Sequence, residues 1–438
     1  MIEALREKSL FYIILFIWWL TGTYAGPAVY AVIPLTLLFF WQRKMHEELF
    51  IGFLFILILS DSIEFAKNIK DVYLVILALF LFIGKENLTF NNKLFFWFIP
   101  YFVIAFICLF YSVSFFTSFQ KTISYLLLLI VVPNYIQNIY SEKRASFLKN
   151  IVLFILVFFL LVLLLRLIRP EIVIYEDRYR GVFIMNPNGL GVFSLLSFLF
   201  FSMVNEYFPS LFSKKENIFI YSLCILIIFL SSSRTAVTGI LIFLLFKYLY
   251  KISPFIGFII FLVILSTYQY IADNAGSIIM SLGLQGFFRV ETLENASGRF
   301  IAWQFAWDNI QQTAFFIGNG IGHTEALFKK YYVQLSMLGH QGHAHNSYLT
   351  FWLDTGLIGL LLYLFAFISL FIKGSKNTIL SIPVMYAILF SVFFESWITA
   401  SLNPFTIQVF AIMTIITSDV FNDEIESTEQ SEIPDEIG

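Results

Sequence analysis

Four of the five histidines lie in one polar stretch between apolar blocks, residues 272–346. They are His323, His340, His343 and His345, and the last is followed by Asn346 and then directly by a long apolar run. A neutral imidazole can take a proton from an attacking hydroxyl near neutral pH, and a neighbouring amide can orient it or hold a substrate. The position of His345 therefore predicts a general base at a membrane surface, with Asn346 beside it.

The arginines are distributed unevenly along the chain. When the apolar blocks are threaded from a cytoplasmic N-terminus, three of the ten arginines fall in inner loops and seven face outward. The planar fork of arginine binds phosphate or carboxylate at two points, so outward arginines suggest an anionic ligand, with snorkelling at the interface as the alternative. Arg234 is the strongest candidate, because Ser231-Ser232-Ser233-Arg234 interrupts apolar sequence with almost no loop around it.

The sequence after His345 continues as a spaced motif. His345 and Asn346 are followed, after nine residues, by Gly356 and, after two further residues, by Gly359, so the glycines are three apart and lie on one helical face. Small residues at that spacing let helices approach closely. The string resembles the His-Asn signature of the bacterial O-antigen ligase and O-antigen polymerase superfamily.

Three further stretches resemble the same superfamily and extend the similarity from Arg178 to Gly359, somewhat under half of the chain. They are Arg178-Tyr179-Arg180-Gly181 running to Asn186-Pro187-Asn188, the string Ser233 to Ala236, and Ser297-Gly298-Arg299 with Trp303 and Gly318 to Gly322. The last glycine run predicts a turn, since it lacks the lysine and strand context of a phosphate-binding loop.

The resemblance implies a metal-independent membrane glycosyltransferase without a cofactor, in a GT-C-like fold. Its donor would be an undecaprenyl pyrophosphate-linked glycan, and its acceptor a lipid-linked glycan (polymerase) or lipid A-core (ligase). A chain-length regulator protein is a further implied partner, and no nucleic acid is. By residue, Arg178, Arg180, Arg234 and Arg299 would bind the pyrophosphate, and His345 with Asn346 would activate the acceptor hydroxyl. The Phe-, Ile-, Lys- and Asn-rich composition favours the polymerase.

Three alternatives stay open at this point. Asp61 and Glu64, in an early outer loop, could serve a metal-dependent transferase, and His340, His343 and His345 could form a zinc site, although their spacing matches no strong template. A lipid-linked oligosaccharide flippase would also need outward arginines. A transporter should place ionisable residues near the midplane and show repeated halves, which the sequence lacks.

The composition indicates that transmembrane helices position these residues. With 59% hydrophobic and 13% charged residues, the chain belongs in a bilayer. The apolar blocks predict an all-α polytopic protein of about 12–14 transmembrane helices: helices with short loops over 1–271, a long periplasmic loop over 272–346, and C-terminal helices over 347–420. Residues 421–438, rich in acids, predict a disordered cytoplasmic tail.

The basic residues predict the orientation. The short inner loops hold 15 of the 27 lysines and arginines, the density expected where basic residues are retained in the cytoplasm. We therefore expect the bacterial inner membrane as the location, both termini in the cytoplasm and the active site on the periplasmic side.

Overall fold

The computed structural model describes residues 6–83, 93–175, 178–181, 183–249, 251–281, 283, 299–340, 342–399, 402–418 and 421. Within these residues the chain is helical apart from one short hairpin, β1 (Ile174–Tyr175) and β2 (Arg178–Tyr179). The strands are antiparallel, with Ile174 opposite Tyr179 and Tyr175 opposite Arg178. The prediction of an all-α architecture is confirmed.

Helices long and apolar enough to cross a membrane occur five times in the described part of the chain, and five shorter apolar helices accompany them. The protein is therefore a polytopic membrane protein, as predicted. The number of 12–14 spans stays a prediction. The five long segments are Leu94–Tyr111, Phe115–Lys143, Ala145–Ile168, Pro187–Tyr207 and Ser347–Gly374.

The described residues in the first half of the chain are mostly helical. The helices Val29–Gln42 and His46–Leu59 are short, with 14 residues each, while the apolar run at Val72 belongs to a 20-residue helix that begins at Glu64. The elements are α2 (Ser9–Tyr24), η1 (Gly26–Ala28), α3 (Val29–Gln42), α4 (His46–Leu59), α5 (Glu64–Ile83), α6 (Lys93–Cys108), η2 (Leu109–Tyr111), α7 (Phe115–Lys143), α8 (Ala145–Ile168) and α9 (Pro170–Val173).

The second half contains the helices on which the motifs lie. Polar caps start several of them: Asn186 and Asn403 accept backbone N–H groups at α10 and α19, and Ser213 forms a capping box with Glu216 at α11. The elements are α10 (Pro187–Tyr207), α11 (Lys214–Ser231), α12 (Arg234–Tyr248), α13 (Pro254–Ser281), α14 (Arg299–Asn309), η5 (Ile310–Ala314), α15 (His323–Lys330), α16 (Tyr332–Met337), α17 (Ser347–Gly374), α18 (Ser381–Phe394) and α19 (Pro404–Thr417).

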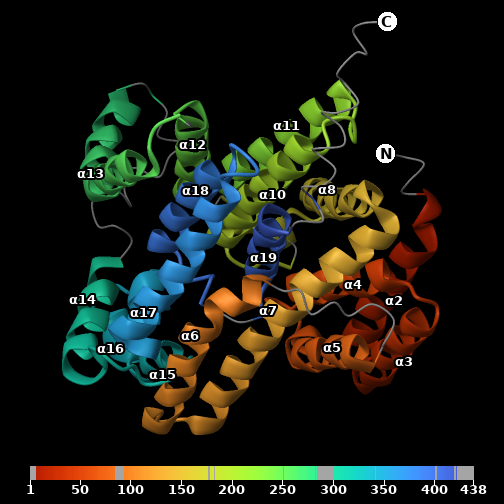
Figure 1. Cartoon of the computed structure of the whole chain (residues 1–438), viewed down its shortest axis with the longest axis horizontal. Coiled ribbons are helices and arrows are strands. Elements are labelled where there is room, and N and C mark those ends of the chain that lie inside the picture. Colours follow the sequence, from red (N-terminus) through yellow and green to blue (C-terminus); the bar gives the residue numbers. More distant parts are fainter. Residues whose placement is uncertain are drawn as a thin grey trace, which may run out of the picture.

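Helix α19 lies at the centre of the bundle, among α7, α10 and α17 (Figure 1). Nearly all of its residues are buried, as are those of its neighbour α10. A hydrogen bond of 2.9 Å from Gln408 Nε2 to Ser197 Oγ joins these two helices inside the core. The arrangement leaves the ends of α10, α17 and α18 to converge beside one another.

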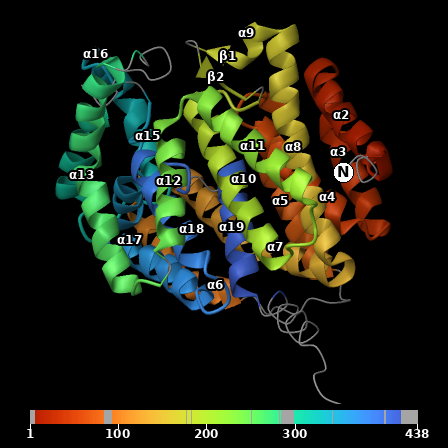
Figure 2. The same cartoon turned by 90° about the horizontal axis from the view of Figure 1, so that it is seen from above.

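Helix α8 connects two chemically different ends of the molecule. At its start, the buried Glu47 carboxylate accepts from Lys143 Nζ at 2.7 Å and from Lys8 Nζ at 3.0 Å. At its other end Arg166 Nε donates to Tyr179 of the hairpin at 3.0 Å, and Figure 2 shows α9 and the hairpin there. The 24 residues of α8 span roughly 36 Å, enough to cross a bilayer core.

The segment predicted as one long loop is itself largely helical where it is described. Helix α13 runs past Ala272 to Ser281, and α14, η5, α15 and α16 follow before α17. Ser297 and Gly298 of the third motif, and the acidic tail beyond Phe421, lie outside the described residues.

Candidate active site

His345 occupies a strained position at the start of α17. Its backbone has a φ of 46°, a left-handed conformation that non-glycine residues rarely adopt. The next residue, Asn346, is buried and caps the helix, its side-chain oxygen accepting from Leu349 N at 3.1 Å. The cap holds the backbone where it enters α17, directly after His345.

The partner of His345 is Glu395, which directly follows α18. His345 Nδ1 lies 3.2 Å from Glu395 Oε2, and Arg299 Nη2, at the start of α14, lies 2.8 Å from Oε1. The carboxylate is buried, with a side chain only 10% exposed. One buried acid thus joins the predicted base to one of the predicted phosphate-binding arginines, across three helices.

The environment of Glu395 keeps it ionised. Burial alone would raise the pKa of this carboxyl group, but the hydrogen bond to His345 and the charge of Arg299 outweigh it, so the pKa lies below its ordinary value. An ionised carboxylate only accepts hydrogen bonds, so His345 carries its proton on Nδ1 when neutral. Its Nε2 then has a lone pair that can accept a proton. This nitrogen faces Gly342, because a Cβ built on that glycine would lie 3.6 Å from it.

Arg178 reaches the same carboxylate through Asn188. Its Nη2 donates to Asn188 Oδ1 at 2.5 Å, and the Asn188 side chain in turn hydrogen-bonds to Glu395. The Nε of Arg178 donates to the carbonyl of Ser231 at 3.0 Å, at the end of α11. Arg178 and Asn188, two residues of one family-like stretch, are therefore connected to Glu395 by a chain of charge-assisted hydrogen bonds.

Arg234 lies at the turn that Arg178 binds. Ser232 has a φ of 50°, Ser233 caps α12 by accepting from Ala236 N, and Arg234 is the first residue of the helix. The turn packs closely against α10, because a Cβ on Gly191 would meet the Cβ of Ser233 at 2.2 Å. Arg234 thus combines its own charge with the positive end of a helix dipole, a combination suited to an anion.

Arg180 is directed elsewhere. Its Nε donates to the carbonyl of Ile172 at 3.1 Å, and its guanidinium lies 5.6 Å from the centre of the Tyr175 ring. It therefore packs within the α9 and hairpin region, and its predicted contact with pyrophosphate stays a prediction. Among the predicted arginines, the structure joins Arg178 and Arg299 to His345 most directly.

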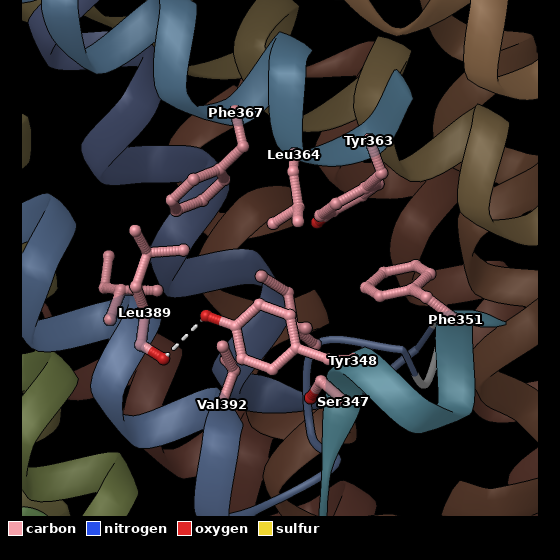
Figure 3. A pocket seen from close by; sticks show the side chains of 10 residues that line it. Ser347, Tyr348, Phe351, Tyr363, Leu364, Phe367, Leu389 and Val392 are labelled. Atoms are coloured by element: carbon pink, nitrogen blue, oxygen red, sulfur yellow. Dashed lines mark hydrogen bonds between the residues drawn. The ribbon is translucent and has the colours of Figure 1, made fainter. Parts of the chain in front are cut away.

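The seam between α17 and α18 holds His345 and Glu395 in place. Ser347 Oγ donates to the Glu395 carbonyl at 2.8 Å, and Tyr348 donates its hydroxyl to the Leu389 carbonyl at 3.0 Å. Figure 3 shows Ser347 and Tyr348 beside Leu389 and Val392 of α18, in a small apolar pocket. These bonds on either side of the pocket fix the spacing of base and carboxylate.

The motif glycine Gly356 breaks α17. It has a φ of 74° and a ψ of 176°, and the backbone of residues 315–320 runs into the break, with Leu357 N donating to the Phe315 carbonyl at 2.9 Å. A Cβ on Gly356 would lie 2.2 Å from the Phe316 carbonyl oxygen. The predicted close contact between helices is seen at Gly359, which faces Ile104 of α6. At Gly356 the close neighbour is instead the loop backbone of Phe316 and Ile317.

Asp354, two residues before the break, orders the glycine turn. Its carboxylate accepts from Gly322 N and Thr324 N, both at 2.8 Å, and from Thr324 Oγ1 at 2.7 Å. Gly320 and Gly322 each have a φ of 92°. The interpretation of Gly318 to Gly322 as a turn is confirmed, and the turn ties the helices of the loop to α17.

The residues proposed for metal chemistry have other contacts. His340 Nε2 lies 3.1 Å from the carbonyl of His343, and Asp61 accepts from Met185 N at 2.8 Å. Within the described ranges, no three His, Cys, Asp or Glu side chains are grouped so that they could hold a metal ion.

Glu395 and Asn188 are the site residues that motif analysis alone does not assign. Glu395 is a lone acid in the apolar sequence Phe393-Phe394-Glu395-Ser396-Trp397. The rule that singles out Arg234, an ionisable residue interrupting apolar sequence, applies equally to it. Asn188 stands within a quoted motif, but only the fold shows that it connects Arg178 to Glu395.

Part of the chain is similar to a known protein family. Residues 219–364, about a third of the chain, match the sequence model of a family described as O-Antigen ligase. The match includes Arg234, Arg299 and His345, while Arg178 and Glu395 lie outside it. No curated protein matches the chain. Residues 219–364 of this membrane glycosyltransferase therefore form a domain of the O-antigen ligase family.

Proposed function

We propose that the protein is a surface polysaccharide polymerase. It transfers an undecaprenyl pyrophosphate-linked glycan to a sugar hydroxyl on a second lipid-linked glycan. The observation that carries this proposal is the cluster around Glu395, in which one buried carboxylate holds the imidazole of His345 and the guanidinium of Arg299. A base beside fixed cations is what a displacement that expels pyrophosphate requires.

The reaction proceeds in one displacement. The acceptor hydroxyl gives its proton to His345 Nε2 as its oxygen bonds to the anomeric carbon of the donor sugar. The bond from that carbon to the pyrophosphate oxygen breaks, and the lipid pyrophosphate leaves with the electron pair. Attack opposite the leaving group inverts the configuration of the sugar carbon. Glu395 stabilises the imidazolium that forms on His345.

The arginines stabilise the leaving group. Negative charge builds on the pyrophosphate as the bond breaks, and fixed guanidinium groups bind such oxygens without reorganising. Arg234 at the start of α12, with Arg178 and Arg299 nearby in the network, fits this role, and Arg180 would bind a more distant part of the ligand. In this proposal fixed guanidinium charges do the work that a metal ion does in other transferases.

We place the active site on the periplasmic side. The site lies at the end of α8 that carries Arg166, whereas the opposite end holds Lys8 and Lys143. Lysine-rich ends are typical of the cytoplasmic face. Lipid-linked glycans are elongated outside the cytoplasm, so this orientation brings donor and base together.

An O-antigen ligase is the second candidate, and the description of the matched family favours it. In that reaction the acceptor is lipid A-core, and the groups around the base are unchanged. The two functions predict different lipopolysaccharide in cells from which the gene has been deleted. Deletion should leave a single repeat unit on lipopolysaccharide if the protein is the polymerase, and none if it is the ligase.

The direct test uses purified protein in vesicles. With lipid-linked repeat units as the only substrate, a polymerase yields a ladder of longer lipid-linked chains. If products form only when lipid A-core is added, the ligase assignment replaces the polymerase. If neither substrate is transferred, the proposed function is wrong.

A further inference from the structure

An open groove runs along α14, on the loop side of the site. Its volume is about 760 Å³, within the 300–1,000 Å³ typical of small-molecule sites. It is bounded by α14, by the end of α16 and by Leu349 in the first turn of α17. Its lining includes Phe300, Trp303, Gln304, Trp307, Asp308 and Leu338.

The lining combines flat aromatic surface with polar groups. Phe300 is 50% exposed, and Trp303 and Trp307 are partly exposed next to it. Gln304 and Asp308, one turn apart and both exposed, hydrogen-bond to each other at 2.7 Å. A sugar ring has an apolar C–H face and a rim of hydroxyls, so aromatic rings with an amide and a carboxylate beside them match both of its surfaces.

One polar atom of the lining lacks a protein partner. The indole Nε1 of Trp303 is buried and has no hydrogen-bond acceptor among the described residues. Tryptophan donates one hydrogen bond and accepts none, and a buried donor without a partner is costly. Because this atom is buried, the groove offers a ligand the exposed ring surfaces of Phe300 and Trp303 and not the indole N–H.

The groove leads to the reacting groups. Arg299, which binds Glu395, directly precedes Phe300 on α14. Leu349, at the other wall, is in the first turn of α17 and comes four residues after His345 in the chain. A glycan in the groove would therefore run away from the anomeric carbon that is attacked.

We infer that the α14 groove binds the glycan of a lipid-linked substrate, beyond the sugar that reacts. The inference rests on the proposed function. A polyprenyl chain is the competing occupant, but it would cover Gln304 and Asp308 without offering either a hydrogen bond, which is unfavourable. The glycan leaves no such group unsatisfied.

The test compares two donors with the same lipid pyrophosphate, one bearing the complete repeat unit and one bearing its first sugar only. Phe300→Ala and Gln304→Ala should raise KM for the complete repeat roughly three- to tenfold, as expected for one lost stacking or polar contact. KM for the one-sugar donor should not change. Phe316→Ala is the matched control, since this exposed loop aromatic does not line the groove.

Two results would overturn the inference. Equal KM values for both donors in wild type and variants would show that the groove does not contact the glycan. A change that follows the length of the polyprenyl chain, not the glycan, would show that the groove holds lipid. In either case transfer by the wild type would continue, so the proposed function would stand.

A binding measurement covers the case in which no transfer is seen. The probe is the oligosaccharide released by mild acid from the cell's own lipid-linked repeat units, titrated into the full-length protein by saturation-transfer NMR. Signal with wild type that Phe300→Ala abolishes would support the groove even if the proposed function failed. Equal signal in both would refute it.

Discussion

Replacing Glu395 by glutamine removes the charge of the side chain and keeps its size, so this variant tests what the charge contributes. The side chain keeps its size and one oxygen that can accept from Arg299, but it loses the charge that fixes the His345 proton on Nδ1. An amide can donate to Nδ1, which would leave Nε2 protonated and unable to act as a base. Since a positioned general base contributes about 10²–10⁴-fold, we expect kcat to fall by that factor while KM changes little.

The same substitution should lower stability in a pH-dependent way. Glu395→Gln leaves Arg299, 16% exposed, without its counter-charge. Breaking a buried pair costs about 3–5 kcal/mol, and the remaining hydrogen bond should reduce this to about 2 kcal/mol. Because the folded pKa of Glu395 is depressed, its stabilisation is present above its ordinary pKa of 4.5 and is lost as pH falls through the folded value.

The assay is turnover of lipid-linked repeat units across pH, paired with thermal unfolding of the purified protein. Glu395→Asp serves as the control, since it keeps the charge on a shorter side chain and should lose less activity than Glu395→Gln. The loss of stability on acidification should also be shallower in Glu395→Gln than in wild type. Wild-type kcat in Glu395→Gln would refute the assignment of Glu395 as the group that positions His345.

Three further substitutions test other parts of the site. Arg178→Lys should reduce transfer about 10- to 100-fold, because lysine cannot bind the Ser231 carbonyl and Asn188 together; unchanged steady-state rates would show that this fork is unimportant. Arg234→Lys should also slow turnover if two-point phosphate binding is its role, and wild-type rates would mean that charge alone matters. Gly356→Ala should destabilise the protein by about 1–3 kcal/mol or more in thermal unfolding, since it adds a clash with loop backbone to an unfavourable φ. A loss no larger than that of Gly26→Ala, which has a φ of 53° and no neighbour within 4 Å, would show that the loop contact contributes nothing.

The sequence is most informative where apolar pattern and local chemistry coincide. The helical membrane architecture follows from composition, and the apolar run directly after Asn346 predicts the helix that begins at Ser347. The glycine turn before the histidines is also predicted correctly. Each of these features depends on residues close together in the chain.

Features that depend on distant residues could not be predicted in the same way. The pairing of His345 with Glu395 joins residues 50 positions apart, and Arg178 reaches that pair only through Asn188. The break at Gly356 needs a loop segment that arrives from before the histidines. Arg180 and Arg178 look equivalent in sequence, yet the hairpin directs Arg180 to the Ile172 carbonyl.

The most direct test of His345 as the base compares two histidine variants in the reconstituted vesicle assay. His345→Ala should abolish transfer of lipid-linked repeat units, because it removes the imidazole that Glu395 holds in place. His46→Ala, at the start of α4 beside Glu47, should transfer at the wild-type rate after the same purification. Full transfer by His345→Ala would contradict the central claim.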